Sequence, residues 1–192
     1  MTDQRITGPL DTENWDESLA QVIDDMAGRP INVHKLMAHH PALLKARWDL
    51  RNYTIAGGDL GQRHTEILIL RVALQMKNWY EWASHVHRGL AAGLTMEEIE
   101  RVKVGPDDPG WQPDERLLIQ AVDELVHDRA VTDATLEALR EHFTDRQILD
   151  AIVTQGAYVT LGCLLNTWET PLDEHVEESS PDPVTRETFE RT

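Results

Sequence analysis

The sequence predicts an all-α fold, and two observations carry this prediction. Strand signals are weak, because no Asn-Gly or Asp-Gly turn separates alternating apolar runs and clusters of β-branched residues are few. Helix signals are dense, because N-cap residues and glycine or proline stops recur along the chain. A chain of 192 residues is also long enough for one domain with a sizeable core.

The first half of the chain reads as a succession of helical segments. They are expected at residues 15–27, 32–40, 41–56, 63–76, 78–92 and 95–102. Pro41 can open the third segment, since proline suits the first turn of a helix. The 63–76 segment is apolar on nearly all sides, which predicts a central position in the core. Thr95 and Glu98 fit a capping box.

The second half begins after the clearest loop, GPDDPGWQP at 105–113. Helices are expected at 114–128, 133–142 and 144–168, the last starting with a capping box of Thr144 and Gln147. The two halves are faintly alike: Glu66-Ile-Leu-Ile-Leu parallels Glu115-Arg-Leu-Leu-Ile, and a Leu94-Thr…Ile99 pattern parallels Phe143-Thr…Ile148. An internal duplication of helical hairpins would explain this, and so would chance among amphipathic helices.

The domain boundary is expected near residue 170. Residues 1–170 read as a single all-helical domain, whereas residues 171–192 are acidic and lack a periodic apolar stripe. Taken alone, such a segment is expected to be a flexible tail, or a strap across a neighbouring subunit. The single cysteine, Cys163, lies in the apolar stretch 157–165 and is expected to be a small buried hydrophobe.

Charge and hydropathy exclude several classes of partner. Acidic residues outnumber basic ones 34 to 18, so a net charge of −16 should repel nucleic acid and anionic membranes. The apolar run at 67–76 contains Arg71 and Gln75 and is shorter than the roughly 20 residues that span a bilayer. The first residues lack the features of a secretory signal, so a cytoplasmic protein is expected.

The segment Asn78 to His87, NWYEWASHVH, is the strongest candidate for chemistry. Glu81 and His85 are four residues apart and so lie one helical turn from each other, and Arg88 extends the same face. Nearby tryptophans such as Trp82 would desolvate these groups and shift their pKa values. An exposed Glu-His pair at this spacing is nevertheless commonly only a solvated helix face.

Two charged residues of the preceding helix need partners. Glu66 and Arg71 lie within an otherwise apolar run, and an unpaired buried charge is costly. For Glu66, an internal ion pair and a role in catalysis are equally consistent with the sequence, whereas for Arg71 the structural role is favoured.

A lone cysteine excludes an intramolecular disulfide, a CxxC redox centre and a cysteine-rich zinc site.

The pattern Glu66-x11-Asn78-Trp-Tyr-Glu81-Trp-x2-His85, with GLTMEEI downstream, resembles the carboxymuconolactone decarboxylase and alkylhydroperoxidase D superfamily. The resemblance is strongest across residues 61–102 and implies an AhpD-like helical bundle. In the peroxidase branch two cysteines stand where this chain has Asn78 and Glu81. Neither residue can replace an attacking thiolate, so thiol peroxidase activity is not expected.

The decarboxylase branch is the better match, and it implies acid–base chemistry without a metal or organic cofactor. Its substrate would be a small carboxylated lactone or related unsaturated acid, decarboxylated with proton donation to the carbanion left behind. The resemblance gives Glu66, Glu81 and His85 as catalytic residues, with His85 as the candidate acid. Candidate substrate contacts are Asn78, Tyr80, Trp82, His87 and Arg88. It also implies a homo-oligomer, a trimer or hexamer.

Two alternatives remain at this stage. A metal-dependent hydrolase or lyase could use His64, Glu66, His85 and His87, but His85 and His87 are two residues apart and lie on different sides of a helix. No metal is therefore expected. A catalytically silent relative that binds a small molecule or acts in assembly would also lack the two cysteines.

Overall fold

The computed structural model describes residues 6–191 as an all-helical protein. Within that range the chain forms two 3-10 turns, eleven α-helices and no strand, which confirms the predicted fold class. The elements are η1 (Thr12–Asn14), η2 (Glu17–Leu19), α1 (Ala20–Asp25), α2 (Asn32–Met37), α3 (Pro41–Ile55), α4 (Gln62–Gln75), α5 (Trp79–Ala91), α6 (Met96–Val104), α7 (Pro113–His127), α8 (Asp133–Arg140), α9 (Asp145–Thr167), α10 (Glu174–Ser179) and α11 (Arg186–Glu190).

The helix boundaries follow the local signals closely. The capping boxes of Thr95 with Glu98 and of Thr144 with Gln147 are both formed, and Pro41 occupies the first turn of α3. The exception is the 15–27 segment, which starts as the 3-10 turn η2 and becomes α-helical at Ala20. The side chain of Asp16 accepts a hydrogen bond from the Ser18 amide and so fixes the tighter first turn.

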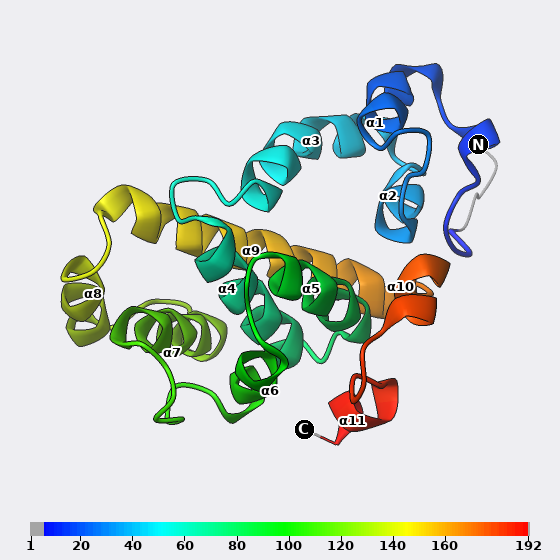
Figure 1. The fold of residues 1–192 in the computed structure, drawn as a ribbon. Coiled ribbons are helices and arrows are strands. Elements are labelled where there is room, and N and C mark those ends of the chain that lie inside the picture. Colours follow the sequence, from blue (N-terminus) through cyan, green and yellow to red (C-terminus); the bar gives the residue numbers. More distant parts are fainter. Residues whose placement is uncertain (1–5, 192) are drawn as a thin grey trace.

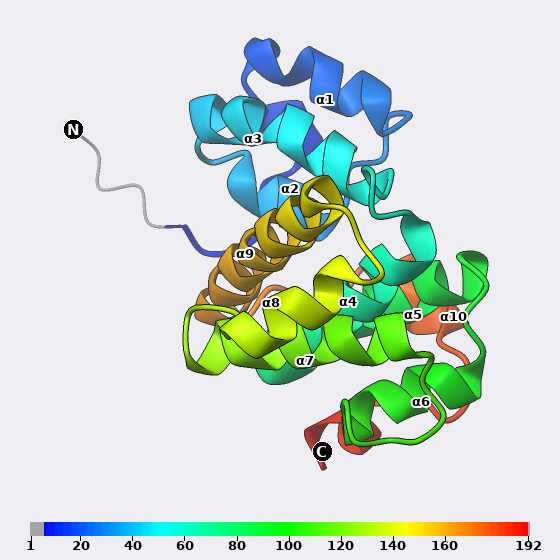
Figure 2. The same cartoon turned by 90° about the vertical axis from the view of Figure 1, so that its left-hand side faces the viewer.

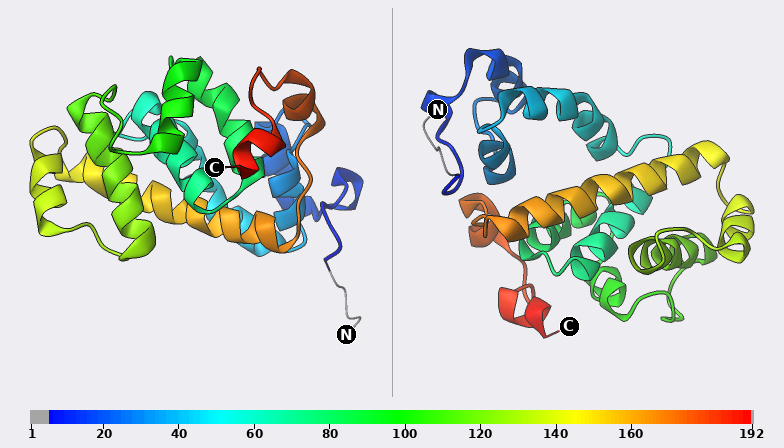
Figure 3. Two further views of the ribbon diagram at one scale, coloured as in Figure 1. Left: turned by 90° about the horizontal axis from the view of Figure 1, so that it is seen from below. Right: turned by 180° about the vertical axis from the view of Figure 1, so that it is seen from behind.

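The long helix α9 runs through the middle of the molecule. Helices α1 to α3 lie on one side of it and α4 to α7 on the other (Figures 1 and 3). Helix α4 packs against α5, α6, α7 and α9. All nine residues from Thr65 to Ala73 are consequently buried, which confirms that this helix is central. In Figure 2 helices α1 and α3 lie at the top of the molecule, above α9.

Helix α9 combines core packing with an exposed apolar face. Its 23 residues and a mean hydropathy of 1.6 over 18 residues would suit a membrane span by length and composition. Its contacts with α4 and α7 are those of a core helix. Leu161 and Leu165 take the buried positions, whereas Cys163 is exposed. The expectation of a buried thiol is therefore wrong, because Cys163 lies between the positions that face the core.

The acidic C-terminal segment packs against its own chain. The Asp173 carboxylate accepts hydrogen bonds from the Asn32 amide, at 2.8 Å, and from the Tyr80 hydroxyl. Val184 and Phe189 are buried, and the Phe189 ring lies 5.6 Å from that of Trp82. A few widely spaced apolar residues thus dock this segment, which explains why the sequence shows no periodic stripe there.

We expect Phe189→Ala to undock α11. Truncating a buried phenylalanine costs about 3–5 kcal/mol, and a five-residue helix has little else to hold it in place. Trypsin should then cleave at Arg186 or Arg191 faster, and the emission of the uncovered tryptophans should shift to longer wavelength. Glu190→Ala, at an exposed residue of the same helix, is the matched control. Equal cleavage rates for wild type and Phe189→Ala would contradict the prediction.

Candidate functional site

Asn78 sets the register of the helix that carries most of the site. Its side chain accepts a hydrogen bond from the Glu81 amide at 2.8 Å and so caps the N-terminus of α5. The same side chain donates to Asn166 of α9, at 2.7 Å, which ties this end of α5 to the central helix. Because α5 starts at Trp79, successive turns place Glu81, His85 and Arg88 on one face.

Glu66, Glu81 and His85 converge in the interior. The Nδ1 of His85 lies 2.6 Å from Glu66 Oε2, across the interface between α5 and α4. The other ring nitrogen, Nε2, lies 3.4 Å from Glu81 Oε2. All three residues are buried, with exposures of 6%, 4% and 3% in chain order. One imidazole is thus held between two buried carboxylates, and we call these residues the carboxylate–histidine relay.

The two carboxylates decide the charge of this imidazole. Burial by itself lowers the pKa of His85, but the charge and hydrogen bond of Glu66, followed by the contact with Glu81, raise it above its usual value. The imidazolium form is therefore favoured, with Nδ1–H donating to Glu66. A protonated histidine that stays charged above the usual histidine range can serve as a reservoir for one proton.

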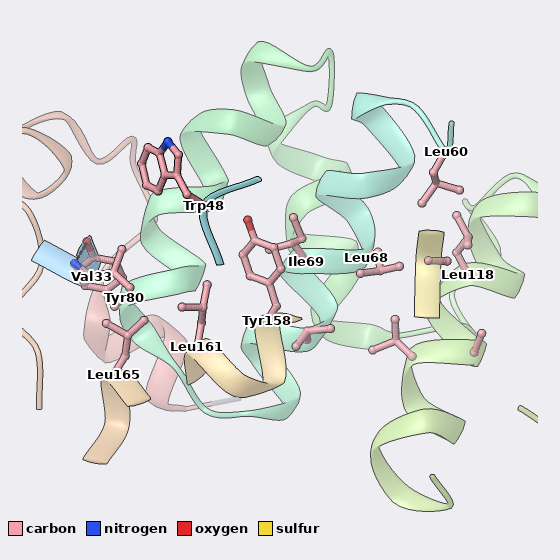
Figure 4. Close-up of a cluster of buried hydrophobic side chains, with 14 of the residues drawn as sticks. Val33, Trp48, Leu60, Leu68, Ile69, Tyr80, Leu118, Tyr158, Leu161 and Leu165 are labelled. Carbon is pink, nitrogen blue, oxygen red and sulfur yellow. Dashed lines mark hydrogen bonds between the residues drawn. The ribbon is translucent and has the colours of Figure 1, made fainter. Parts of the chain in front are cut away.

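Tyr158 of α9, a third helix, packs against the relay. Its ring meets the His85 ring edge-on, with centroids 5.0 Å apart. Figure 4 shows the hydroxyl pointing away from α9. Burial, followed by the charge of Glu81, raises the pKa of Tyr158. Tyr158 therefore remains a neutral phenol, able to donate a hydrogen bond beside Glu81.

Three arginines surround this group. Arg47 and Arg51 stand four residues apart on α3, and Arg88 lies one turn beyond His85 on α5. The positive charge of Arg88 lowers the pKa of both His85 and Tyr158. The negative charge of Glu81 raises the pKa of Arg47. Burial lowers the pKa of Arg47, and it lowers that of Arg51 to about 10 with the help of the neighbouring arginine charges.

Tyr80 and Trp82 have their main partners outside the relay. The hydroxyl of Tyr80 accepts from the Val33 amide and donates to Asp173, so it joins α5 to α2 and the C-terminal segment. Trp82 belongs to a second apolar cluster beside Phe189. His87 has a buried Nε2 without a hydrogen-bond partner in the described chain. The structure therefore groups Arg88 with the relay and gives Tyr80 and Trp82 packing contacts elsewhere.

A large cavity is separate from this chemistry. It has a volume of about 1260 Å³ and runs between the C-terminal segment and the ends of α4, α5 and α9. Asn78 and Tyr80 line it, but none of the three relay residues does. It is open to solvent along the docked C-terminal segment, and no histidine is among its described lining residues. We therefore take the relay as the candidate site.

The residues proposed for a metal do not form a ligand set. His64 contacts Asp114 at 3.0 Å, whereas Glu66 and His85 contact each other. Across residues 6–191 no three histidine, cysteine, aspartate or glutamate side chains are grouped as metal ligands.

Part of the sequence around this site matches a known protein family. Residues 41–124, from α3 to α7, match the carboxymuconolactone decarboxylase family, and Glu66, Glu81 and His85 all lie within this match. The match spans less than half of the chain. None of the curated proteins is similar enough to match the sequence.

Solved structures share the AhpD-like fold of this chain. A protein of unknown function from Agrobacterium tumefaciens, described as an antioxidant defence protein AhpD, is 25% identical, with a TM-score of 0.64 over 71% of this chain and 94% of its own. An uncharacterized peroxidase-related protein from Silicibacter sp. TM1040 is 17% identical, with a TM-score of 0.76 over 94% of this chain and all of its own.

A debrominase, Bmp8, solved with 2,3,4-tribromopyrrole, is also similar in fold. It is 11% identical, with a TM-score of 0.76 over 92% of this chain and 96% of its own. At these identities the two last likenesses establish the fold alone. Proteins of this fold thus include an enzyme, the debrominase.

Sequence reasoning missed four residues of the site. His34, Arg47, Arg51 and Tyr158 come from α2, α3 and α9, and only the fold brings them to α5. The i, i+4 spacing of the two arginines on a helix was a usable but weak signal. Nothing local distinguishes His34 or Tyr158, because both stand among apolar residues and read as core. His34 and Tyr158 also lie outside the region that matches the family.

His34 should make the fold sensitive to acid. Burial, followed by the charges of Arg51, Arg47 and Arg88, lowers the pKa of His34 to about 3. Below about pH 6.5 the unfolded chain binds a proton that the folded chain refuses, so stability falls as pH falls, by up to about 1.4 kcal/mol per pH unit. Urea titration would measure the free energy of unfolding of both proteins at pH 6.5 and 5.5. Between these pH values, His34→Gln should lose about 1 kcal/mol less of this free energy than wild type does. An equal loss in the two proteins would contradict the prediction.

Proposed function

We propose that this protein is a cofactor-independent lyase that decarboxylates a small carboxylated lactone or unsaturated acid. One observation carries the proposal: a buried histidine whose two ring nitrogens both face buried carboxylates, at 2.6 and 3.4 Å. Such a relay can store one proton away from water and deliver it to a carbon acid. The absence of cysteine at positions 78 and 81 favours proton chemistry over thiol chemistry.

The geometry supports Glu81 as the group that meets the substrate. Glu66 holds Nδ1 of His85 and fixes the orientation of the ring, so only Nε2 can pass a proton onward. That nitrogen faces Glu81, which is also near Arg47 and Tyr158. His85 would therefore act through Glu81, which then acts as the general acid.

The reaction balances with one proton. The bond between the substrate carbon and its carboxylate breaks, carbon dioxide leaves, and the electron pair remains as a dienolate. Tyr158 stabilises the enolate oxygen with a hydrogen bond. His85 passes its Nε2 proton to Glu81, which delivers it to a carbon of the dienolate, and solvent then reprotonates His85. Because the pKa of His85 is raised, activity should decline only as pH rises through a value above about 6.5.

Turnover in D₂O tests the proposal directly. Release of carbon dioxide from a panel of carboxylated lactones and β,γ-unsaturated acids would be measured, and NMR would locate deuterium in the product. We expect one deuterium at a carbon of the former dienolate, and a loss of about 10²–10⁴-fold in kcat for Glu81→Gln. Arg116→Gln, at an exposed residue of α7, is the control. No release from any compound would favour a silent, binding relative.

We also propose that the protein works as a homo-oligomer in the cytoplasm. Leu43, Leu50 and Tyr53 of α3 are 39–47% exposed, and Leu149 and Val153 of α9 are 61% and 42% exposed. Exposed apolar residues on neighbouring helices support burial between subunits. Sedimentation at micromolar concentration should show a trimer or hexamer, and a monomer would contradict this part of the proposal.

A further inference from the structure

Arg47, Arg51 and Arg88 form a concentration of positive charge in a protein whose net charge is −16. The charges of Arg47 and Arg88 repel that of Arg51 and lower its pKa. The charges of all three arginines lower the pKa of His34. Each of the three arginines is only partly exposed. Gathering like charges away from water costs free energy, so such a cluster calls for a compensating anion.

The surrounding chain does not supply enough of that compensation. None of the three arginines forms an ion pair with a residue between 6 and 191, although ten other basic residues there do. The charge of Glu81 attracts that of Arg47, but Glu81 also forms an ion pair with the imidazolium of His85. Asp25 acts on Arg51, and its carboxylate already accepts from Trp48 at 2.6 Å.

His34 provides a second, independent sign of an absent ligand. Its side chain is buried, with 2% exposure, and its Nδ1 has no hydrogen-bond partner in the described chain. Buried polar atoms are normally paired, so an orphaned nitrogen among three arginines indicates a group that is not part of the chain. The neutral form of His34 retains one N–H donor for that group.

Packing and hydrogen bonds fix the positions of Arg51 and His34, as is usual for residues of a binding site. The guanidinium of Arg51 stacks over the Trp48 ring at 4.8 Å, and His34 meets the same ring edge-on at 5.0 Å. Helix α2 is tied to α5 through the Val33 amide and the Tyr80 hydroxyl, at 3.2 Å. Trp48 and Tyr158 both belong to one apolar cluster (Figure 4). The donors therefore need little reorganisation to accept an anion.

We propose that Arg47, Arg51, Arg88 and His34 form a subsite that binds a carboxylate group of the substrate, beside the carboxylate–histidine relay. This inference rests on the proposed function for its substrate. Guanidinium groups bind carboxylates through paired charge-assisted hydrogen bonds. Because such bonds stabilise a carboxylate in its ground state, the group held here is one that the reaction leaves in place.

Binding of succinate to the full-length protein tests the subsite without requiring turnover. Calorimetry would compare succinate with uncharged succinamide and with inorganic phosphate, on wild type and on Arg47→Gln, Arg51→Gln and His34→Gln. We expect succinate to bind wild type more tightly than either other probe, and each arginine variant to lose about 10- to 100-fold in affinity. Arg116→Gln, an exposed arginine outside the cluster, should bind as wild type does.

The results separate this inference from the proposed function. Tighter binding of phosphate than of succinate would overturn the carboxylate assignment, and equal affinity of succinate for wild type and Arg51→Gln would overturn the subsite. Loss of succinate binding in the arginine variants, in a protein without turnover, would support the subsite while the decarboxylase proposal fails. Turnover whose KM is unchanged in Arg47→Gln and Arg51→Gln would support the decarboxylase and overturn the subsite.

Discussion

Replacing His85 with glutamine is expected to abolish turnover and to destabilise the protein by about 3–5 kcal/mol. Among residues 6–191 the imidazolium is the only cation in contact with Glu66, and it also contacts Glu81, whose side chain is 6% exposed. Without it, two ionised carboxylates would remain in the interior with poor hydration. Urea denaturation at pH 7 should show the loss of stability, and the decarboxylation assay the loss of rate.

The pH dependence and a double variant distinguish charge from packing. Carboxylates ionise above about pH 4, so the destabilisation by His85→Gln should be greater at pH 6 than at pH 4.5. The raised pKa of His85 stabilises the folded wild type below about 6.5, and this contribution disappears as pH rises through the folded value. Glu66→Gln combined with His85→Gln should be more stable than His85→Gln alone. An equal loss at both pH values would refute the ion-pair account.

Arg71→Met is expected to destabilise the protein by about 3 kcal/mol without altering catalysis by the folded fraction. Arg71 is buried and binds both carboxylate oxygens of Asp123, each at 2.7 Å. A third bond, also 2.7 Å, goes to the Val102 carbonyl at the end of α6. These bonds join α4 to α6 and α7, and methionine keeps the volume while removing all of them.

Asp123→Asn provides the matched control for this ion pair. It leaves the bond to Val102 intact and keeps one acceptor for the guanidinium, so the loss of stability should be about half as large. Thermal denaturation would rank the two variants, and kcat/KM corrected for the folded fraction should match wild type in both. A specific fall in kcat/KM for Arg71→Met would show that Arg71 also acts on the substrate.

Local rules account for most of the secondary structure of this protein. The capping boxes at Thr95 and Thr144 and the proline at the start of α3 depend on neighbouring residues alone, so the sequence locates these helix starts closely. The apolar surface of α4 likewise requires a buried position wherever the other helices lie. The spacing of Glu81 and His85 already implies that they share a helix face.

The tertiary structure decided what that face does. The 3.6-residue period cannot show whether a Glu-His pair faces water or the core, and only packing against α4 brings Glu66 within 2.6 Å of His85. Cys163 illustrates the same limit, because an apolar neighbourhood in sequence did not predict its exposed position on α9. The docked C-terminal segment depends on scattered contacts such as Phe189 with Trp82, which leave no periodic pattern.

The sequence by itself determined the all-α class, most of the helix starts before residue 170 and the residue types available on α5. Those features arise from interactions within a few residues of the chain, which a linear pattern records. The tertiary structure alone brought Tyr158, the arginines of α3 and His34 to Glu81 and His85. Their pKa shifts and shared positive charge depend on distances across helices that are far apart in sequence, and packing sets those distances.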